Sequence, residues 1–418
     1  MHSAGFSKRN AIQPFSVAIL ATTMKFPLEG IRVLDIGTFI AGPYCATMLA
    51  EFGAEVIKVE PPGGDGLRKF GTMTDCGDTL VWLNESRNKK CVTLNLRSEA
   101  GRNVLKRLIA TADVVVENFR PGVMEKWGLG YEDIKAINPR TILVRISAYG
   151  QEGPYIGRPG FARVAHAFAG LSLLAGEPGR IPVTPGSTSL ADYSAGLYAA
   201  FGTMLALRSR DHTGVGQVVD LALYEPLFRM LDEMVPAYQQ TGFVRERMGA
   251  NTVNVAPHSH YPTRDGHWIA IACTTDAMFK RLAVVMEQPA LADADAFGAV
   301  AARVGQLETI NDIVTTWTLQ HDCSTLLERC EKGEVPAAKL FSVADMFEDP
   351  QYQARGSIQH VPSRIGDVAV PSVIPKLSNT PGEIQWLGRE PGSHNYEIFH
   401  GIFGMTEQEI AQATQMAP

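Results

Sequence analysis

The chain has 418 residues, of which 45% are hydrophobic and 20% are charged, and its formal net charge is −6. This length is sufficient for two domains, and the composition is that of an ordinary globular protein. The mild negative charge and the lack of a long basic run argue against nucleic acid as a partner. No apolar run approaches the length of a transmembrane helix, so we expect no membrane partner either.

The cysteine and histidine residues give no sign of a disulfide framework or a metal site. Six cysteines are scattered along the chain without a C-x-x-C motif, which fits a reducing compartment. His258 and His260 alternate on one predicted strand, but no third ligand follows nearby, so we expect no metal. A cytoplasmic location is the expectation, with the mitochondrial matrix as the alternative for a eukaryotic source.

The first 26 residues differ in character from the rest of the chain. Lys8 and Arg9 precede a short apolar stretch at residues 15–21, and no acidic residue occurs before Glu29. A signal or transit peptide is one interpretation. Because the apolar stretch is short and the segment is poor in arginine, we favour a dispensable, disordered extension over residues 1–26.

Residues 27–215 have the pattern of a large α/β domain. Buried strands are predicted at 31–36, 54–60, 91–96, 113–118 and 141–146, and helical segments such as 44–52 and 98–111 alternate with them. This alternation predicts a doubly wound, Rossmann-like domain with a parallel sheet. Its ligand-binding loops should lie at the carboxyl ends of the strands.

The second half of the chain predicts a smaller α+β domain and a segment that returns to the first domain. Residues 216–244 are expected to form a strand edge and a long linker helix. The small domain, residues 245–338, begins with a hairpin around Asp265-Gly266 and continues with three helices. Residues 339–418 are rich in loops and are assigned to the large domain.

Asp192 begins one of the most apolar helices of the chain. Residues 195–207 contain no charge and many small side chains, and a helix that is apolar on every side should be buried on every side. A carboxylate at its start would be partly desolvated, while the helix N-terminus favours the anion. This setting favours an ionised nucleophile. The alternative is a structural one, because Ser189 and Asp192 have the spacing of a capping box.

Charged residues at predicted strand ends suggest a binding site for an anionic ligand. Arg120 follows one strand and the cluster Arg87-Asn-Lys-Lys90 precedes another, although such groups also occur in ordinary turns and surfaces. Glu60 ends the second strand, where dinucleotide-binding folds place a ribose-binding acid. The preceding turn, residues 37–43, lacks G-x-G-x-x-G, so a nicotinamide oxidoreductase is only a third choice.

Several short segments recur in the order found in one enzyme family. They include residues 27–35, 41–43, 53–65, 88–89, 116–122, 128–131, 213–220 and 261–266. Together with Asp192, these segments resemble the class III CoA-transferases, the group of formyl-CoA and carnitine CoA-transferases. The resemblance extends from about Pro27 to the C-terminus and rests on the ordered set rather than on any single motif.

The resemblance implies a homodimer of two interlocked, ring-like chains and a covalent mechanism on Asp192. The carboxylate would attack an acyl-CoA thioester to give a mixed anhydride, and the CoA thiolate would return to give an aspartyl-CoA thioester. An acceptor carboxylate would reverse these steps. Water must be excluded because anhydrides hydrolyse. Coenzyme A is then a substrate, and no permanently bound cofactor is expected.

The resemblance also implies that CoA lies against the α/β domain. The backbone near Ile40 and Ala41 is expected to approach the thioester. We add Arg68 and Arg120 to the expected CoA contacts on the basis of their charge alone. The positions that match the family's CoA contacts are Asn88, Lys89, Asn118, Phe119, Lys126 and Trp127.

The chain departs from the family pattern at several positions near the expected site. Ile40 stands where formyl-CoA transferase has a catalytic glutamine, and no tetraglycine loop occurs near Ala256-Pro257, so another cover must shield the intermediate. Residues 160–162 read Gly-Phe-Ala, without the Asp that many relatives have, and residues 335–338 lack a usual glycine.

Two other functions share the expected fold. An α-methylacyl-CoA racemase would also have the aspartate, but it needs a second base, a His in a Gly-His-Asp run, where this chain has Gly160-Phe161-Ala162. His166 is further along and is expected to be structural. The other possibility is a non-catalytic CoA-binding subunit of a heteromer.

The acids that exchange CoA are only weakly indicated. Arg163 stands at a position that is usually neutral in relatives, and it could bind a second carboxylate. Tyr149 is the other residue that we expect to contact the substrate. On this basis we expect succinyl-CoA as donor and a dicarboxylate as acceptor. A plain surface role for Arg163 is an equally good interpretation.

Overall fold

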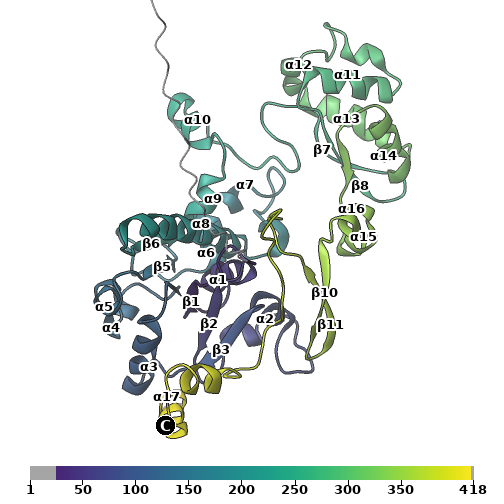
Figure 1. Cartoon of the computed structure of the whole chain (residues 1–418). Coiled ribbons are helices and arrows are strands. Elements are labelled where there is room, and N and C mark those ends of the chain that lie inside the picture. The colour runs from purple at the N-terminus through teal and green to yellow at the C-terminus, as the bar shows by residue number, and fades with distance from the viewer. Residues whose placement is uncertain (1–24, 416–418) are drawn as a thin grey trace, which may run out of the picture.

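The computed structural model describes residues 25–415, so the predicted extension over residues 1–26 lies almost wholly outside the described residues. The described chain forms a large α/β domain, a smaller domain and a C-terminal segment that returns to the large domain (Figure 1). The predicted fold class, a Rossmann-like large domain with a smaller α+β domain, is confirmed.

The large domain is built on a six-stranded sheet in which all neighbouring strands are parallel. Its order is β3-β2-β1-β4-β5-β6, so β1 and β4 lie side by side where the order of the strands reverses. Open parallel sheets bind ligands in the crevice at this point, beyond the carboxyl ends of the strands. The strands are β1 (Arg32–Asp35), β2 (Glu55–Glu60), β3 (Lys89–Thr93), β4 (Val114–Glu117), β5 (Ile142–Ser147) and β6 (Val218–Ala222).

Alternate strand residues supply two separate hydrophobic cores, one on each face of the sheet. Val33 points to the face covered by α1 (Ala41–Glu51) and α8 (Leu190–Thr213). Leu34 points to the other face, which α3 (Glu99–Ile109) and α5 (Tyr131–Ile137) cover. Buried strands with both faces covered are what near-continuous Val, Leu and Ile runs predict.

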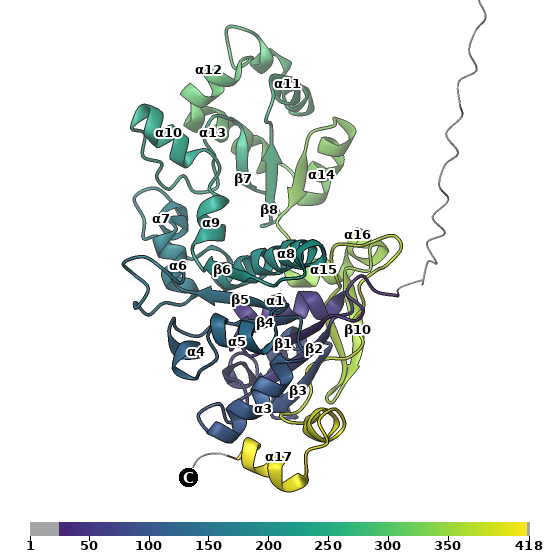
Figure 2. The same ribbon diagram turned by 60° about the vertical axis from the view of Figure 1, so that its left-hand side comes forward.

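Small residues on α8 allow it to approach α1 very closely. A Cβ atom on Gly196 would lie 2.8 Å from the carbonyl oxygen of Ala41, so a larger residue would push the helices apart. This contact places the second turn of α8 against the first turn of α1, and Asp192, one turn earlier, lines the same cavity as Ala41 at the carboxyl ends of the strands. Figure 2 shows α8 lying across the sheet on the side that faces the small domain.

The predicted linker helix over residues 216–244 is not continuous. Its first part is strand β6, and the rest forms two short helices, α9 (Glu225–Arg229) and α10 (Met234–Thr241). Asp232 between them has a positive φ of 44°, which a continuous right-handed helix does not permit.

The small domain has its own core against a three-stranded antiparallel sheet. Phe279 and Leu282 of α11 and Trp317 of α13 are buried in this core. The sheet order is β7-β8-β9. The elements are β7 (His258–Pro262), β8 (Trp268–Ala272), α11 (Asp276–Val285), η3 (Pro289–Ala292), α12 (Val300–Gly305), α13 (Leu307–Thr318), α14 (Cys323–Lys332) and β9 (Ala337–Lys339).

The C-terminal segment runs along β3, the outermost strand of the large sheet. The backbone N–H of Asn88 donates to the carbonyl of Trp386, and that of His394 donates to the carbonyl of Cys91. Thr93 donates its backbone N–H to the side chain of Asn395. The elements of this segment are α15 (Val343–Glu348), α16 (Pro350–Ala354), β10 (Ile358–Ser363), β11 (Gly366–Pro371), η4 (Tyr396–His400) and α17 (Glu407–Thr414).

Short helices in the remaining loops complete the large domain and shape its ligand-binding edge. They are η1 (Gly66–Lys69), α2 (Leu80–Glu85), α4 (Val123–Lys126), α6 (Ala162–Phe168), α7 (Leu171–Leu174) and η2 (Pro185–Ser187).

Candidate active site

A cavity of about 220 Å³ opens at the carboxyl ends of β1, β4 and β5 and contains Asp192. The loop after β1 contributes Thr38 to Ala41, the loop after β4 contributes Asn118 to Pro121, and the loop after β5 contributes Tyr149, Arg158 and Phe161 among others. Three strand ends and the start of α8 therefore meet at one carboxylate, which we call the Asp192 cavity.

Asp192 lies in the first turn of α8 without the partner that a capping role requires. Ser189 makes no side-chain capping hydrogen bond, so the capping-box alternative is not formed. Burial raises the pKa of Asp192 to about 6. The carboxylate is therefore mostly ionised at neutral pH, yet it is poorly solvated, a state that favours nucleophilic attack.

His166 already accepts a hydrogen bond at the start of α8, so it is not placed to act as a second base. Its Nε2 accepts a hydrogen bond from the backbone N–H of Ala191 at 2.9 Å, and the ring is 1% exposed. Burial, with a smaller contribution from Arg163, lowers the pKa of His166. The neutral imidazole holds the helix start beside Asp192, which is the structural role expected from the sequence.

The loop that carries Ile40 and Ala41 is held by two polar side chains, the half-buried Asn118 and the buried Asp65. Asn118 accepts from the backbone N–H of Thr38 at 2.7 Å and donates to its carbonyl at 2.8 Å. Asp65 accepts from the backbone N–H of Phe39 at 3.1 Å, and Phe39 has a positive φ of 58°. A backbone of this kind persists only when its surroundings hold it, and here it directs the start of α1 into the cavity.

Beneath that loop lies a buried network of paired charges. Asp35 is paired with Lys89 at 2.9 Å and with Lys58 at 3.5 Å, and Lys58 also meets Asp65 at 3.1 Å. Although burial alone would raise it, Lys58 and backbone donors hold the pKa of Asp65 below its ordinary value. Lys89 also donates to the carbonyl oxygen of Pro43 at 2.7 Å, so the network binds the base of α1 to the sheet.

A second cavity of about 440 Å³ adjoins the first. Thr38 and Phe119 line both cavities, and the second extends over the carboxyl ends of β2 and β3. Its walls are mainly apolar, and the rings of Phe119 and Trp127 meet edge to face with centroids 5.3 Å apart. Two adjoining cavities of this kind offer an elongated ligand one site for each of its ends. The second cavity is lined by Ile36, Thr38, Val59, Glu60, Pro61, Pro62, Gly63, Leu94, Asn95, Leu96, Arg97, Phe119 and Trp127.

Most of the site residues predicted from the sequence line one or both of these cavities. The structure brings together Asp192, Ile40, Ala41, Tyr149, Asn118, Phe119, Arg120 and Trp127. Lys126 is exposed beside Trp127 at the end of α4 and lines neither cavity.

Three predicted CoA contacts instead hold the chain's own segments together. Arg68 is buried between Glu60 and Asp78 and lies over the ring of Trp82. Asn88 donates to the carbonyl of Glu383 and accepts from the backbone N–H of Gln385, which fastens the C-terminal segment. Lys89 is fully buried in the charge network described above. Because their polar atoms face protein partners, we do not retain these three as direct CoA ligands.

The predicted carboxylate-binding residue also lies elsewhere. Arg163 is exposed on α6, donates to the Thr184 hydroxyl at 3.2 Å and does not line the Asp192 cavity. Arg158, which does line it, and Arg97, which lines the second cavity, were not predicted from the sequence. Both follow strand ends of the predicted parallel sheet, so the rule that ligands bind beyond those ends could have indicated them.

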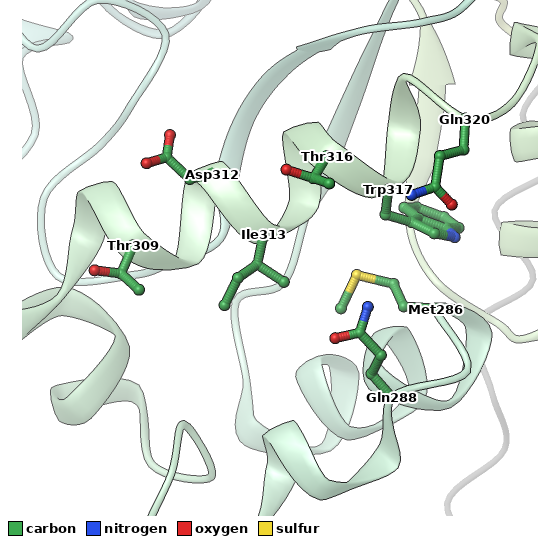
Figure 3. A pocket seen from close by; sticks show the side chains of 8 residues that line it. All are labelled: Met286, Gln288, Thr309, Asp312, Ile313, Thr316, Trp317 and Gln320. Atoms are coloured by element: carbon green, nitrogen blue, oxygen red, sulfur yellow. The ribbon is translucent and has the colours of Figure 1, made fainter.

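A further hollow of about 360 Å³ lies in the small domain, away from Asp192. It lies beside α13, where Ile313 and Trp317 face Met286 and Gln288 of the neighbouring segment (Figure 3). Neither Asp192 nor any residue of the two crevice cavities lines it.

Comparison with known proteins identifies the family. The model of CoA-transferase family III matches residues 28–395. The chain belongs to CoA-transferase family III. This CoA-transferase is 51% identical to the succinyl-CoA–L-malate CoA-transferase beta subunit of Chloroflexus aurantiacus over 93% of this chain and 97% of that protein. It is 43% identical to the succinyl-CoA–D-citramalate CoA-transferase of the same organism, over 92% and 96% of the two chains.

A solved structure agrees with the fold. The crystal structure of a CaiB/BaiF family protein from Brucella suis matches with a TM-score of 0.81 and 33% identity, over 90% of this chain and 99% of that one. Because its family and its curated relatives are CoA-transferases, the protein acts on acyl-CoA thioesters. Between residues 25 and 415, no helix has both the length and the apolar character needed to cross a membrane.

Proposed function

We propose that this CoA-transferase moves CoA from succinyl-CoA to a four- or five-carbon dicarboxylate such as L-malate or D-citramalate, through a covalent intermediate on Asp192. The observation that carries the proposal is the Asp192 carboxylate, which is desolvated and lines a cavity formed by three strand ends. The names of relatives up to 51% identical supply the acids.

In the first half-reaction, an Asp192 carboxylate oxygen attacks the thioester carbonyl carbon of succinyl-CoA. The C–S bond breaks and the CoA thiolate leaves, so a mixed anhydride of Asp192 and succinate remains. The thiolate then attacks the aspartyl carbonyl carbon, and succinate leaves with the bridging oxygen. The enzyme now carries CoA as an aspartyl thioester, and no proton has been gained or lost.

In the second half-reaction, a carboxylate of the acceptor attacks the aspartyl thioester and releases CoA thiolate. The thiolate attacks the acceptor carbonyl of the new anhydride, which forms acceptor-CoA and restores the Asp192 carboxylate. Ile40 offers no polar side chain to this chemistry, so backbone N–H groups at the start of α1 are the donors available for the developing oxyanion.

We propose one orientation for CoA in the two adjoining cavities. We place its nucleotide in the second cavity, against Trp127 and near Arg97, and its thioester in the Asp192 cavity. The pantetheine arm would then pass Thr38 and Phe119, which line both. Arg120 lines the Asp192 cavity and Lys126 is exposed next to Trp127, so we propose both as sources of positive charge for the phosphates.

A dimer is part of the proposal, because one face of α8 is left open. The sequence predicts burial on every side, but Leu197, Phe201, Met204 and Leu205 are 45%, 59%, 42% and 55% exposed in the single chain. These four positions form one stripe of the helix, and a contiguous apolar stripe of this size marks a protein interface. We propose that a second copy covers it, and the mass of the purified chain in solution tests this.

The test of the mechanism is chemical trapping. The protein is incubated with succinyl-CoA and then with hydroxylamine, which converts an acyl-activated aspartate to a hydroxamate. We expect inactivation and a hydroxamate on the peptide that contains Asp192. A non-catalytic CoA-binding subunit or a racemase would show neither, and modification of another residue would contradict the proposal.

A further inference from the structure

We propose that Arg158 binds the carboxylate that does not react, and that it thereby makes the enzyme selective for dicarboxylates. This inference rests on the proposed function, because it concerns which acids reach Asp192. Succinate and malate each carry a second carboxylate two carbons away from the reacting one. That group must avoid the negative charge of Asp192 and needs a cation elsewhere in the same cavity.

Two arginines line the Asp192 cavity, and their positions distinguish their roles. Both arginines line the Asp192 cavity and neither lines the second cavity, but Arg120 directly follows Phe119, which lines both, so Arg120 is the one next to the CoA side. Arg158 lies in the loop after β5, together with Tyr149 and Phe161, which line the Asp192 cavity and not the second one. On this ground we assign the carboxylates of the acyl group and of the acceptor to Arg158, and the CoA side to Arg120.

The Arg158 guanidinium is already positioned for this task. Its central carbon lies 3.6 Å from the centroid of the Tyr155 ring, and Tyr155 meets Tyr149 edge to face at 5.6 Å. A planar guanidinium stacked on an aromatic ring keeps its N–H groups directed outward at its edge, which suits a carboxylate that accepts two parallel hydrogen bonds. Less side-chain freedom is then lost when the acid binds.

Within the described part of the chain, no protein carboxylate competes for Arg158. Among residues 25–415, no ion pair within 4.0 Å involves it, whereas Arg145, at the base of the same region, is paired with Glu117 and Glu125. Arg163, the cation suggested by sequence, bonds to Thr184 instead. One such arginine would serve both half-reactions, because donor and acceptor share the same spacing of carboxylates.

The test compares two acceptors that differ only in the second carboxylate. These are L-malate and (R)-3-hydroxybutyrate, in which a methyl group replaces that carboxylate, with succinyl-CoA as donor throughout. In a ping-pong reaction, kcat/KM for the acceptor reports only the half-reaction that follows formation of the CoA-enzyme. An effect of the variant on the donor therefore does not enter the ratio of the two values.

We expect Arg158→Ala to lower kcat/KM for L-malate by about 10- to 100-fold, the range of a lost charge-assisted pair. The value for (R)-3-hydroxybutyrate should change by less than about 3-fold. Arg163→Ala is the matched control and should leave both values unchanged, because Arg163 is exposed like Arg158 but does not line the Asp192 cavity. Arg158→Gln, which keeps a polar side chain without the charge, should reproduce the change in ratio if the alanine variant folds poorly.

Two results would overturn the inference while the proposed function stands. In the first, Arg158→Ala lowers kcat/KM equally for L-malate and for (R)-3-hydroxybutyrate, which would indicate a role in CoA binding or in folding. In the second, Arg163→Ala changes the ratio of the two kcat/KM values and Arg158→Ala does not. The proposed function fails separately, if the wild-type enzyme shows no preference for L-malate or forms no hydroxamate on Asp192. In that case the inference fails with it.

Discussion

Buried and half-buried carboxylates lie near the carboxyl ends of the sheet, and they differ in whether they have partners among residues 25–415. Asp35 and Asp65 are enclosed by Lys58 and Lys89. Asp192 lies in the first turn of an apolar helix, where burial alone raises its pKa to about 6. The paired carboxylates stabilise the loop that shapes the site, whereas the unpaired one remains free to react, at a cost in stability.

The largest expected effect is on catalysis at the unpaired carboxylate. Asp192→Asn should lower kcat by roughly 10⁴-fold or more, because an amide cannot form the anhydride or the thioester. Asp211→Asn, at the exposed other end of α8, is the control and should retain full activity. The rate of CoA transfer from succinyl-CoA to L-malate measures both, with deamidation excluded by mass spectrometry. Transfer at the wild-type rate would contradict the assignment of the nucleophile.

Removing a paired carboxylate should instead destabilise the fold. Asp35→Asn leaves Lys58 and Lys89 buried without their shared counter-charge, which we expect to lower the free energy of unfolding by about 3–5 kcal/mol. Urea unfolding at one fixed protein concentration measures this change, since association affects the midpoint. A change of less than about 1 kcal/mol would show that the network contributes little to stability.

The same substitution at Asp192 should change stability in the opposite direction. The folded-state pKa of about 6 exceeds the ordinary value of 3.8, so the fold favours the protonated form. The stabilising contribution of that proton is complete below the ordinary pKa and is lost as pH rises through about 6. Asp192→Asn, which is neutral at every pH, should therefore raise the free energy of unfolding at pH 7 by about 1–3 kcal/mol. Equal stability of the variant and the wild type at pH 7 and pH 5 would exclude this interpretation.

The smallest expected effect is the pH dependence of the wild-type rate. The anion of Asp192 is the nucleophile, so kcat/KM for succinyl-CoA should be nearly constant above pH 7. It should fall toward tenfold per pH unit below about pH 6. Initial rates between pH 4.5 and pH 8 test this. A profile that stays level down to pH 4.5 would mean that the carboxylate is better solvated than its surroundings indicate.

The sequence predicts the large domain well because its strands are continuous buried runs. The strand expected at residues 31–36 is observed as Arg32–Asp35, and the one expected at 54–60 is observed as Glu55–Glu60. Such runs are determined locally by β-branched side chains. The placement of Asp192 at the start of an apolar helix follows from the same local pattern.

The roles of individual charged residues could not be predicted in this way, because the tertiary fold, and not a local sequence pattern, selects their partners. Lys89 and Asp35 are 54 residues apart, and Arg68 binds Glu60 and Asp78 through the shape of a loop. A basic residue beside a strand looks the same in sequence whether it faces a ligand or a buried carboxylate. The exposed face of α8 was not predicted for a related reason. Apolar side chains indicate that a helix face is buried, but they do not tell whether the same chain or a second chain buries it.

The contact between the C-terminal segment and β3 has a consequence for the solution behaviour of the protein. An outermost strand with unpaired backbone groups is a template on which another molecule can add a strand, and this leads to aggregation. Here the backbone of residues 386–395 and the side chain of Asn395 occupy those groups on β3. A variant truncated before Trp386 would expose them, so we expect it to precipitate on expression even though Asp192 and both cavities remain in the chain.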